Sequence, residues 1–360
     1  MSRATLGFSV MTRALATSVL SRVGTLGSIG CKVGSGEAPP PGGSPGFGRR
    51  PLARVGRRRQ RAREGCEGPA GPHCSRGLPP PRCRPHPQER RAASMSDAQP
   101  ITGLRRGEVA ERVFLCGDPA RVARIARGWD EAREVANVRE FRVVTGRARG
   151  LPVSAASTGV GAPGTAILVE ELVKLGAHTL LRVGNSGGLA PDLALGDLVV
   201  TTGAVRDDGT SRAYVPPEYP AVADHALVGA LLAAARARGV PCRAGITWSL
   251  DAFYVRNAAL AADGSLVTMS AGRYWGRAHA ERIEAMRAAG VLNCEMEAGT
   301  LLTLAGLFGV RAGCVCVVSD RTPWPGPAEL DLDRNMDAAI AVAHDALAAT
   351  ADGGPPARAG

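Results

Sequence analysis

The chain has 360 residues, enough for one large domain or two small ones. Its formal charge of +11 is concentrated in residues 1–94, which hold 17 Lys and Arg against 4 Asp and Glu, while the rest of the chain holds 27 against 29. Residues 95–360 therefore lack the basic excess of a nucleic-acid-binding protein. No apolar run reaches the ~18–20 residues of a membrane span, so we expect neither nucleic acid nor a membrane as a partner.

Residues 1–94 are dominated by Pro, Gly and Arg and show no apolar period, which predicts a disordered leader. Its first 36 residues carry Arg and Ser without an acidic residue, as a transit peptide does. Alternatively the native protein begins at Met95 and the leader is translated upstream sequence, which the length of the Arg-Pro-Gly tract favours. An RNA-binding tail would need interleaved aromatic residues, which are missing. The sequence predicts one folded domain over 95–352 and a disordered tail over 353–360.

Predicted strands and helices alternate along the folded domain. We expect strands at 112–116, 141–145, 153–157, 178–183, 198–202, 242–248 and 314–318. We expect helices that begin after Gly117 and near Ala298, and helices over 163–175, 223–238, 281–289 and 333–349. The GNSGG segment, 184–188, is expected to form a turn, and 254–280 a long polar excursion. The alternation predicts an α/β fold around a central mixed or parallel sheet.

Polar residues gather where the predicted strands end. Such clusters lie at 117–121, 182–186, 251–253, 295–297 and 319–321. Ligands of α/β sheets bind beyond the carboxyl ends of the strands. These clusters are therefore the candidate site.

Glu295 and Glu297 interrupt an apolar run at the predicted exit of a strand into a helix. Residues two apart on an extended segment point the same way, so both carboxylates can face one cavity, with Met296 turned aside. A carboxylate accepts two hydrogen bonds at once, which suits the vicinal hydroxyls of a ribose. The alternative is a helix N-terminus, where the helix dipole favours acidic side chains.

Three arginines stand at predicted loop junctions. Arg121 follows the glycine turn of GDPAR at a helix start, whose free amides can hold an oxyanion. Arg182 precedes the GNSGG segment, in which Asn185 and Ser186 can donate hydrogen bonds, and Arg139 precedes another strand. The three can converge on one phosphate, which a guanidinium binds through its fork of donors. The pattern is neither a Walker loop nor a GxGxxG dinucleotide turn.

Two further clusters each have two readings. Asp320 follows the strand-like CVCVV segment beside Arg321, the placement of a general acid toward a leaving base or of a turn cap. Phe253 can stack on a flat ring or belong to the core.

The cysteines after residue 94 lie in apolar, strand-like segments, where a free thiol packs as a small hydrophobe. None has a histidine partner at zinc-type spacing, and the thiols of Cys314 and Cys316 are too close for a metal pair. We therefore expect no metal site and a reducing, cytoplasmic location.

Six ordered motifs resemble those of the nucleoside phosphorylase family, the branch that holds uridine phosphorylase and the hexameric purine and methylthioadenosine phosphorylases. They are GDPAR at 117–121, VREF at 138–141, STGVGAPGTAILVEEL at 157–172, LRVGNSGG at 181–188, DAFY at 251–254 and GVLNCEMEAGTLLTL at 290–304. The resemblance covers roughly residues 100–350. It implies a single catalytic domain with a central mixed, partly barrel-like sheet flanked by helices. The implied enzyme is a pentosyltransferase that cleaves a nucleoside with inorganic phosphate, giving free base and ribose or deoxyribose 1-phosphate.

The resemblance also implies a role for each candidate residue. Phosphate-binding positions are matched by Gly117, Arg121 and Arg182, and by Arg139, which would serve a neighbouring subunit's site. Asn185 replaces the usual Thr or Ser of the phosphate turn and can still donate a hydrogen bond to phosphate. Ribose-binding positions are matched by Met296, Glu297 and Glu295. The expected base-binding residues are Phe253, Arg256, Asn257, Ser186 and Gly187. Catalytic roles are expected for Arg182 and Asp320.

Departures from the family pattern concern the base and the 5′ position. Uridine phosphorylases recognise uracil with a Gln and an Arg that follow soon after the aromatic residue. In this chain the corresponding segment is VRNAAL, 255–260, so Arg256 and Asn257 are the candidate replacements. Asp320 resembles the acid that purine phosphorylases place at the purine N7. The family has a histidine that reaches the ribose 5′ hydroxyl in a neighbouring subunit's site, and this histidine should fall near Ile101.

One carboxylate of this chain matches a potassium ligand of some uridine phosphorylases. It is Glu140, and the serine that accompanies it in those enzymes is Gly164 here. We therefore expect no cofactor.

The sequence predicts phosphorolysis of uridine in nucleotide salvage by a cytoplasmic homo-oligomer, expected as a hexamer built as a trimer of dimers with shared active sites. One alternative is a purine nucleoside or 5′-methylthioadenosine phosphorylase that uses Asp320 as general acid. A nucleoside-binding protein that lost catalysis is another. A hydrolytic nucleosidase is disfavoured because three phosphate-binding arginines have no purpose when water attacks.

Overall fold

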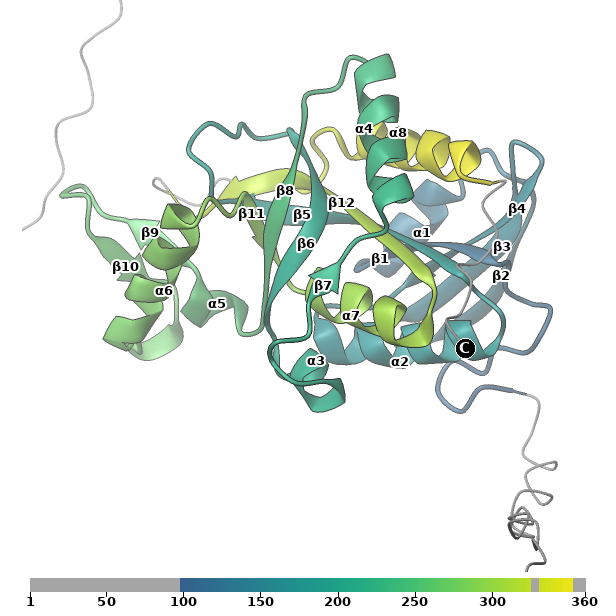
Figure 1. Cartoon of the computed structure of the whole chain (residues 1–360), viewed down its shortest axis with the longest axis horizontal. Helices are drawn as coiled ribbons and strands as arrows, with labels where there is room; N and C mark the ends of the chain where they lie inside the picture. The colour runs from purple at the N-terminus through teal and green to yellow at the C-terminus, as the bar shows by residue number, and fades with distance from the viewer. Residues whose placement is uncertain (1–97, 325–329, 352–360) are drawn as a thin grey trace, which may run out of the picture. The chain divides into compact units, whose positions relative to one another are not determined.

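A mixed ten-stranded sheet forms the centre of the computed structural model, which describes residues 98–324 and 330–351 (Figure 1). The predicted leader and tail lie outside the described residues. The strands are β1 (Arg112–Cys116), β2 (Asp130–Val138), β3 (Phe141–Ala148), β4 (Leu151–Ser157), β5 (Thr179–Gly188), β6 (Leu198–Asp207), β7 (Ala221–Val222), β8 (Cys242–Leu250), β11 (Asn293–Glu295) and β12 (Arg311–Arg321). Their order is β11-β8-β6-β12-β5-β1-β4-β3-β2, with the short β7 on β6.

Five of these strands close into a ring. Strand β11 pairs in parallel with β8 and antiparallel with β5, so the path β5-β12-β6-β8-β11 returns to β5. Strands β5 and β12 are parallel, as are β6 and β8, while β12 and β6 are antiparallel. The prediction of a mixed, partly barrel-like sheet is confirmed.

Helices pack on both faces of the sheet (Figure 1). On one face α1 (Pro119–Ile125), α4 (His225–Ala237) and α8 (Met336–Ala349) share an apolar core with β5 and β12. On the other face α2 (Ala162–Lys174) and α7 (Ala298–Phe308) share a second core. Helix α1 begins where predicted because Asp118 accepts the N–H of Ala120 and Pro119 occupies the first turn. None of the described helices is long and apolar enough to cross a membrane.

Residues 253–288 form a lobe beside the ring (Figure 1). The lobe contains α5 (Phe253–Arg256), the antiparallel pair β9 (Ala258–Leu260) and β10 (Leu266–Thr268), and α6 (Arg277–Ala288). Backbone hydrogen bonds between its β9 segment and Trp324 tie it to the end of β12. The lobe corresponds to the predicted polar excursion, and the predicted helix at 281–289 begins four residues earlier.

The GNSGG segment is the clearest correction to the predicted elements, because it continues β5 instead of forming a turn. Residues 184–188 stay paired with β12 on one side, and 187–188 pair with β11 on the other. Its glycines provide room for side chains: a Cβ at Gly184 would lie 2.8 Å from Arg182 Nη2, and one at Gly187 would lie 3.1 Å from Asp320 Oδ2. Glycine in this strand therefore marks a close approach.

Strand β2 was not predicted from the sequence. Among the described strands it pairs with β3 alone, at the edge of the sheet, and eight of its nine residues are exposed or partly exposed. An edge strand with polar side chains on most positions shows no apolar alternation, so the periodicity on which the prediction relies is missing.

Candidate active site

A cavity of about 620 Å³ lies at the carboxyl ends of several strands. Its wall includes Gly117 after β1, Leu250 at the end of β8, Glu295 at the end of β11 and Asp320 near the end of β12. Each of the five predicted polar clusters contributes at least one residue to this wall. The structure therefore brings together segments that lie far apart in the sequence, from Gly117 to Leu332.

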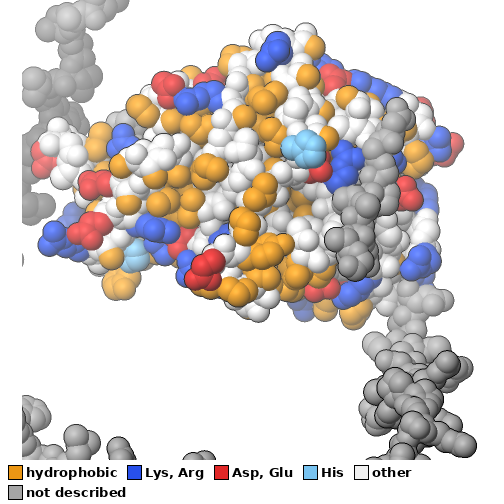
Figure 2. All heavy atoms as spheres, viewed as in Figure 1, with side chains coloured by type: hydrophobic (Ala, Val, Ile, Leu, Met, Phe, Trp, Pro, Cys, Tyr) orange, Lys and Arg blue, Asp and Glu red, His pale blue; other side chains and the backbone are white. Residues whose placement is uncertain are grey.

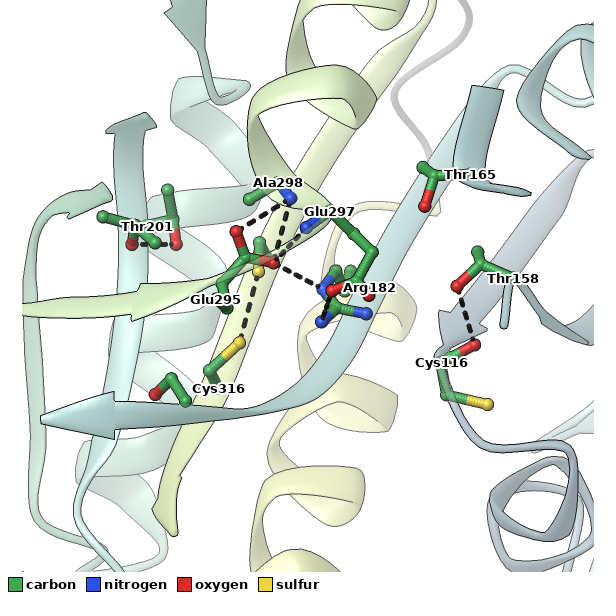
Figure 3. A network of polar contacts seen from close by, with 12 residues as sticks. Cys116, Thr158, Thr165, Arg182, Thr201, Glu295, Glu297, Ala298 and Cys316 are labelled. Atoms are coloured by element: carbon green, nitrogen blue, oxygen red, sulfur yellow. Dashed lines mark hydrogen bonds and ion pairs between the residues drawn. The ribbon is translucent and has the colours of Figure 1, made fainter. Parts of the chain in front are cut away.

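The guanidinium of Arg182 lies between two buried carboxylates (Figure 3). Its Nε donates to Glu295 Oε2 at 3.1 Å, and its Nη2 donates to Glu297 Oε2. The three side chains are each at most 5% exposed. Arg182 is in the middle of β5 but level with the end of β1, because Leu115 is its neighbour across the sheet.

Glu295 and Glu297 have different surroundings. The oxygens of Glu295 accept the backbone N–H groups of Glu297 and Ala298 as well as Arg182 Nε, so Glu295 caps the first turn of α7. Within the described residues, Glu297 accepts the N–H of Gly161, at 2.6 Å, and Arg182 Nη2, and no other donor. A carboxylate has about four acceptor positions. Glu297 uses two of them, whereas Glu295 accepts from three donors, two of which belong to the first turn of α7. The prediction of a helix cap therefore applies to Glu295, and Glu297 has the greater free acceptor capacity toward the cavity.

Arg182 remains positively charged although it is buried. Burial lowers its pKa, but the charges of Glu297 and Glu295 raise the pKa well above the ordinary arginine value. Burial in turn raises the pKa of Glu295, which Arg182 opposes. Arg182 Nη1 is buried and has no hydrogen-bond partner among the described residues. A buried cation with an unused donor on a cavity wall is a natural position for an anion.

Arg121 supplies a second positive charge to the same end of the cavity. Burial lowers its pKa, and the positive charge of Arg182 contributes to that effect. Its Nη2 donates to Asn185 Oδ1, while Asn185 Nδ2 donates to the carbonyl of Leu332 at 3.1 Å. Asn185 therefore orients Arg121, and in this conformation its amide donor does not point to an anion site. Gly117 lines the same cavity, and a Cβ there would be 3.3 Å from the carbonyl oxygen of Gly159.

Phe253 and Asn257 also line the cavity. Phe253 is 36% exposed, so the prediction that this residue belongs to the core is wrong. Asn257 is buried, and its Oδ1 accepts from Thr322 Oγ1 at 3.0 Å. Its Nδ2 makes no hydrogen bond within the described part of the chain, which leaves a donor for a ligand.

Asp320 lines the cavity as well. Ser319 Oγ donates to its Oδ1 at 2.9 Å, and Trp324 Nε1 donates to its Oδ2 at 3.1 Å. Burial raises the pKa of Asp320 above the usual aspartate range, although these two hydrogen bonds oppose the shift. No backbone N–H of the described residues donates to this side chain, so the prediction of a turn cap has no support, and the carboxylate faces the cavity.

Replacing Asp320 with asparagine is expected to raise the melting temperature by a few degrees at pH 8. Because burial raises the native pKa of Asp320, its contribution to stability is fully present below the unfolded-state pKa and is lost as pH rises through the native pKa. Asparagine does not ionise, so this loss of stability disappears. Both hydrogen bonds can remain, because the amide oxygen accepts from Trp324 Nε1 and the amide nitrogen can donate to Ser319 Oγ. Thermal unfolding of both proteins from pH 4 to pH 8 measures the effect. A difference that does not grow with pH would contradict this account.

Two predicted arginines do not reach the cavity wall. Arg139 is exposed between β2 and β3, where its φ is 56°. Arg256 lies in the lobe, with its Nη1 3.4 Å from Asp207 Oδ2. The structure therefore does not place Arg256 next to a base, and Arg139 does not reach the cavity of its own subunit.

Three other predicted residues do line the cavity: Ser186, Gly187 and Met296. The hydroxyl of Ser186 donates to the carbonyl of Val317 at 3.2 Å, so it is already used. Met296 was expected to turn aside, and its presence on the wall corrects that expectation. The reason is that β11 ends at Glu295, so the alternation of a strand no longer applies at residue 296.

Potassium ligation has little support in the residues present. A Cβ at position 164 would lie 2.3 Å from the carbonyl oxygen of Thr158, so a serine does not fit at Gly164 without movement of the backbone. Within 98–324 and 330–351, no group of three His, Cys, Asp or Glu side chains is placed to hold a metal ion. We derive no step through a metal.

Sequence reasoning missed several residues of the site. Gly161 binds Glu297 through its backbone, and Trp324 binds Asp320 through its indole. Val160 and Leu332 contribute apolar wall. Only the VGAPG segment, 160–164, could have been recognised, because it belongs to a motif shared with the family. The backbone donor of Gly161 and the indole of Trp324 leave no pattern in the sequence.

The closed mixed sheet and the cavity at its strand ends define an α/β protein with a small-molecule site of the nucleoside phosphorylase type. The profile of the phosphorylase superfamily matches residues 111–352. The chain belongs to this superfamily.

Three relatives show how similar the chain is to known members. It is 47% identical over 212 residues to a uridine phosphorylase of Thermococcus kodakarensis, covering 59% of this chain and 73% of that protein. It is 38% identical over 239 residues to the uridine phosphorylase of Escherichia coli, covering 66% and 91%. A guanosine phosphorylase of Halorubrum lacusprofundi is 37% identical over 220 residues, covering 61% and 82%.

Proposed function

We propose that this protein cleaves the N-glycosidic bond of uridine with inorganic phosphate and releases uracil and ribose 1-phosphate. The relatives named uridine phosphorylase support uridine as the substrate. The observation that carries the proposal is the buried Arg182, which bridges Glu295 and Glu297 and keeps one donor unused at the cavity wall. This arrangement suits a phosphate on one side of the guanidinium and a ribose on the other.

Charge development on the sugar explains why these residues accelerate the reaction. Breaking the bond between C1′ and the base builds positive charge on the ribose, and the base leaves with the bonding electron pair. A phosphate dianion held by Arg182 and Arg121 beneath C1′ stabilises that charge and then forms the new C1′–O bond. Positioning and electrostatics of this kind supply most of the rate enhancement.

Glu297 is the proposed ligand of the ribose hydroxyls. Its free acceptor positions can take the 2′ and 3′ hydroxyls, while Gly161 N–H and Arg182 fix the carboxylate. Glu295 acts indirectly, because its hydrogen bonds hold the start of α7 and orient Arg182. Met296 gives the sugar an apolar contact.

Asn257 and Phe253 are the proposed base-binding residues. The unused Nδ2 of Asn257 can donate to a carbonyl oxygen of uracil, and the exposed ring of Phe253 can pack on the base. Asp320 lines the same cavity and can accept the N–H of uracil or, when protonated, donate to the departing base. Ile101 cannot hydrogen-bond through its side chain, so recognition of the 5′ hydroxyl must use other groups.

We propose a cytoplasmic homohexamer, built as a trimer of dimers, that acts in nucleotide salvage without a cofactor. The exposed Arg139 supports shared sites because it can complete the phosphate site only of a neighbour. Val160, on the cavity wall, is 80% exposed, which suits contact with a second copy. Figure 2 shows further apolar side chains gathered over the region of α3 (Gly209–Tyr214), β7 and α7, where Tyr214, Val222 and Leu307 are exposed.

The base is tested by comparing nucleosides in phosphate buffer. The full chain is incubated with uridine, thymidine, inosine, guanosine, adenosine and 5′-methylthioadenosine, and the free base is measured by chromatography. We expect uridine to have the highest kcat/KM. Faster release of a purine base would overturn the assignment of uridine and would make Asp320 the general acid.

A further inference from the structure

Asp207, the last residue of β6, accepts or pairs with four side chains from four different elements. Trp248 Nε1 of β8 donates to its Oδ2 at 3.0 Å, and Arg212 Nη2 of α3 donates to its Oδ1 at 3.2 Å. From the lobe, Arg282 Nε of α6 and Arg256 Nη1 of α5 each lie 3.4 Å from Oδ2. The side chain of Asp207 is only 7% exposed. One buried carboxylate thus joins the ring to both helices of the lobe.

The position of Arg256 gives this junction a consequence for the active site. Helix α5 has only four residues, and Phe253 at its start and Asn257 directly after it both line the cavity. Arg256 lies between them in the sequence but points to Asp207 instead of the cavity wall. Fixing Arg256 therefore fixes the direction in which Phe253 and Asn257 face.

We propose that Asp207 is a positioning residue, which holds α5 against the ring so that Phe253 and Asn257 face the nucleoside base. The kinetic consequence of this proposal rests on the proposed function. Arg256 is then a strut, by which we mean a side chain that holds α5 in place through its ion pair with Asp207, and it does not bind the base. Asp207 does not line the cavity, so it acts only through the groups that it holds.

The charges around Asp207 explain why loss of this one carboxylate should loosen the contact between the lobe and the ring. Three guanidinium groups surround a single carboxylate, so the cluster carries an excess of positive charge even with Asp207 ionised. Removing that carboxylate leaves three neighbouring cations without their common partner, and such uncompensated groups separate. Two of them belong to the lobe, so the lobe should move away from the ring.

The alternative is that Arg256 turns to the cavity and binds the base when a nucleoside is present. The two accounts predict opposite effects of Asp207→Asn. A released Arg256 would bind the base as well as before or better if it is a base-binding residue. It would leave α5 loosely held if it is a strut.

The kinetic experiment compares the full chain with the variants Asp207→Asn, Arg256→Gln and the double variant. If Arg256 is a strut, each single variant raises KM for uridine about tenfold, as a small misplacement of binding groups does. The KM for phosphate stays unchanged, and the double variant is no worse than either single one because both break the same contact. Normal KM for uridine in Asp207→Asn, together with a large loss in Arg256→Gln, would overturn the proposal.

Asp345→Asn is the matched control. Asp345 of α8 also pairs with two arginines, Arg149 and Arg238, and it lies outside the cavity. The same carboxylate-to-amide change there should leave both KM values unchanged. An equal rise in KM for uridine in the control would mean that a general loss of stability, and not the position of α5, explains the effect.

Hydrogen exchange gives a readout that does not depend on the reaction. In the ligand-free full chain, Asp207→Asn is expected to speed amide exchange within 253–288 and not in the strands of the ring, while Asp345→Asn leaves 253–288 unchanged. Unchanged exchange in Asp207→Asn would overturn the proposal. If the wild-type protein cleaved no nucleoside, the proposed function would fail while this measurement would still decide the role of Asp207.

Discussion

Replacing Arg182 with alanine is expected to reduce phosphorolysis by at least about a thousandfold, the upper range for loss of one electrostatic group in an active site. The substitution removes the donor that we assign to phosphate and leaves Glu295 and Glu297 facing each other without a cation. These carboxylates then repel the dianion. Initial rates of uracil release at saturating uridine and varied phosphate measure the loss.

The alanine variant also carries a structural cost. Removing one member of a buried ion pair typically destabilises a protein by about 3–5 kcal/mol, so part of any loss of activity could be loss of folded protein. Arg182→Lys avoids this problem because it keeps the charge but cannot bind two carboxylates and an anion at once. We expect it to fold and to lose about a hundredfold or more in kcat/KM for phosphate.

Arg311→Lys is the control for this change. Arg311 is buried, as Arg182 is. It is the first residue of β12, at the end away from Asp320, and its Nε lies 3.6 Å from Asp224 Oδ2. Arg311→Lys should leave kcat/KM for phosphate within about twofold of the wild-type value, because Arg311 lies outside the cavity and takes no part in the reaction. If Arg182→Lys retained more than about a tenth of wild-type activity, the role assigned to its guanidinium would be wrong.

Replacing Glu297 with glutamine is expected to lower kcat/KM for uridine by about a hundredfold or more, since a hydrogen bond to a charged group contributes about 1.5–3 kcal/mol and two hydroxyls are bound. The amide has nearly the same shape but carries one acceptor oxygen instead of two. Its NH2 group must then face Gly161 N–H, Arg182 or the ribose, and the first two are themselves donors.

The 2′ hydroxyl provides a specific test of this role. If Glu297 binds that hydroxyl, Glu297→Gln should cost about tenfold less with 2′-deoxyuridine than with uridine, because one contact is already absent. Glu171→Gln is the control, since Glu171 is a buried glutamate that accepts the N–H groups of Ile101 and Thr102 outside the cavity. An equal loss with both nucleosides would contradict binding of the 2′ hydroxyl by Glu297.

Much of the fold could be predicted from local patterns. The predicted strand at 112–116 has the bounds of β1, and the helix expected near Ala298 begins there, because apolar periodicity and a capping acid are local signals. The turn expected at 184–188 shows the limit of such signals. Glycine was read as a turn residue, whereas here it leaves space for Arg182 and Asp320, which approach from other parts of the chain.

The site could be predicted as a set of residues but not as an arrangement. Glu295 and Glu297 looked equivalent by spacing, and only their hydrogen bonds show that one caps α7 while the other is free for a ligand. Arg256 and Asn257 were equal candidates for the base, and the fold turns one to Asp207 and the other to the cavity. Side-chain direction in a four-residue helix depends on its tertiary contacts, which the sequence does not display.

The central claim is that phosphate, and not water, attacks the nucleoside. The most direct measurement is uracil release from uridine by the full chain with and without inorganic phosphate, with ribose 1-phosphate measured in the same samples. We predict that uracil appears only with phosphate and that one ribose 1-phosphate forms for each uracil. Release at the same rate in phosphate-free buffer, with free ribose as the product, would contradict the phosphate role of Arg182 and Arg121.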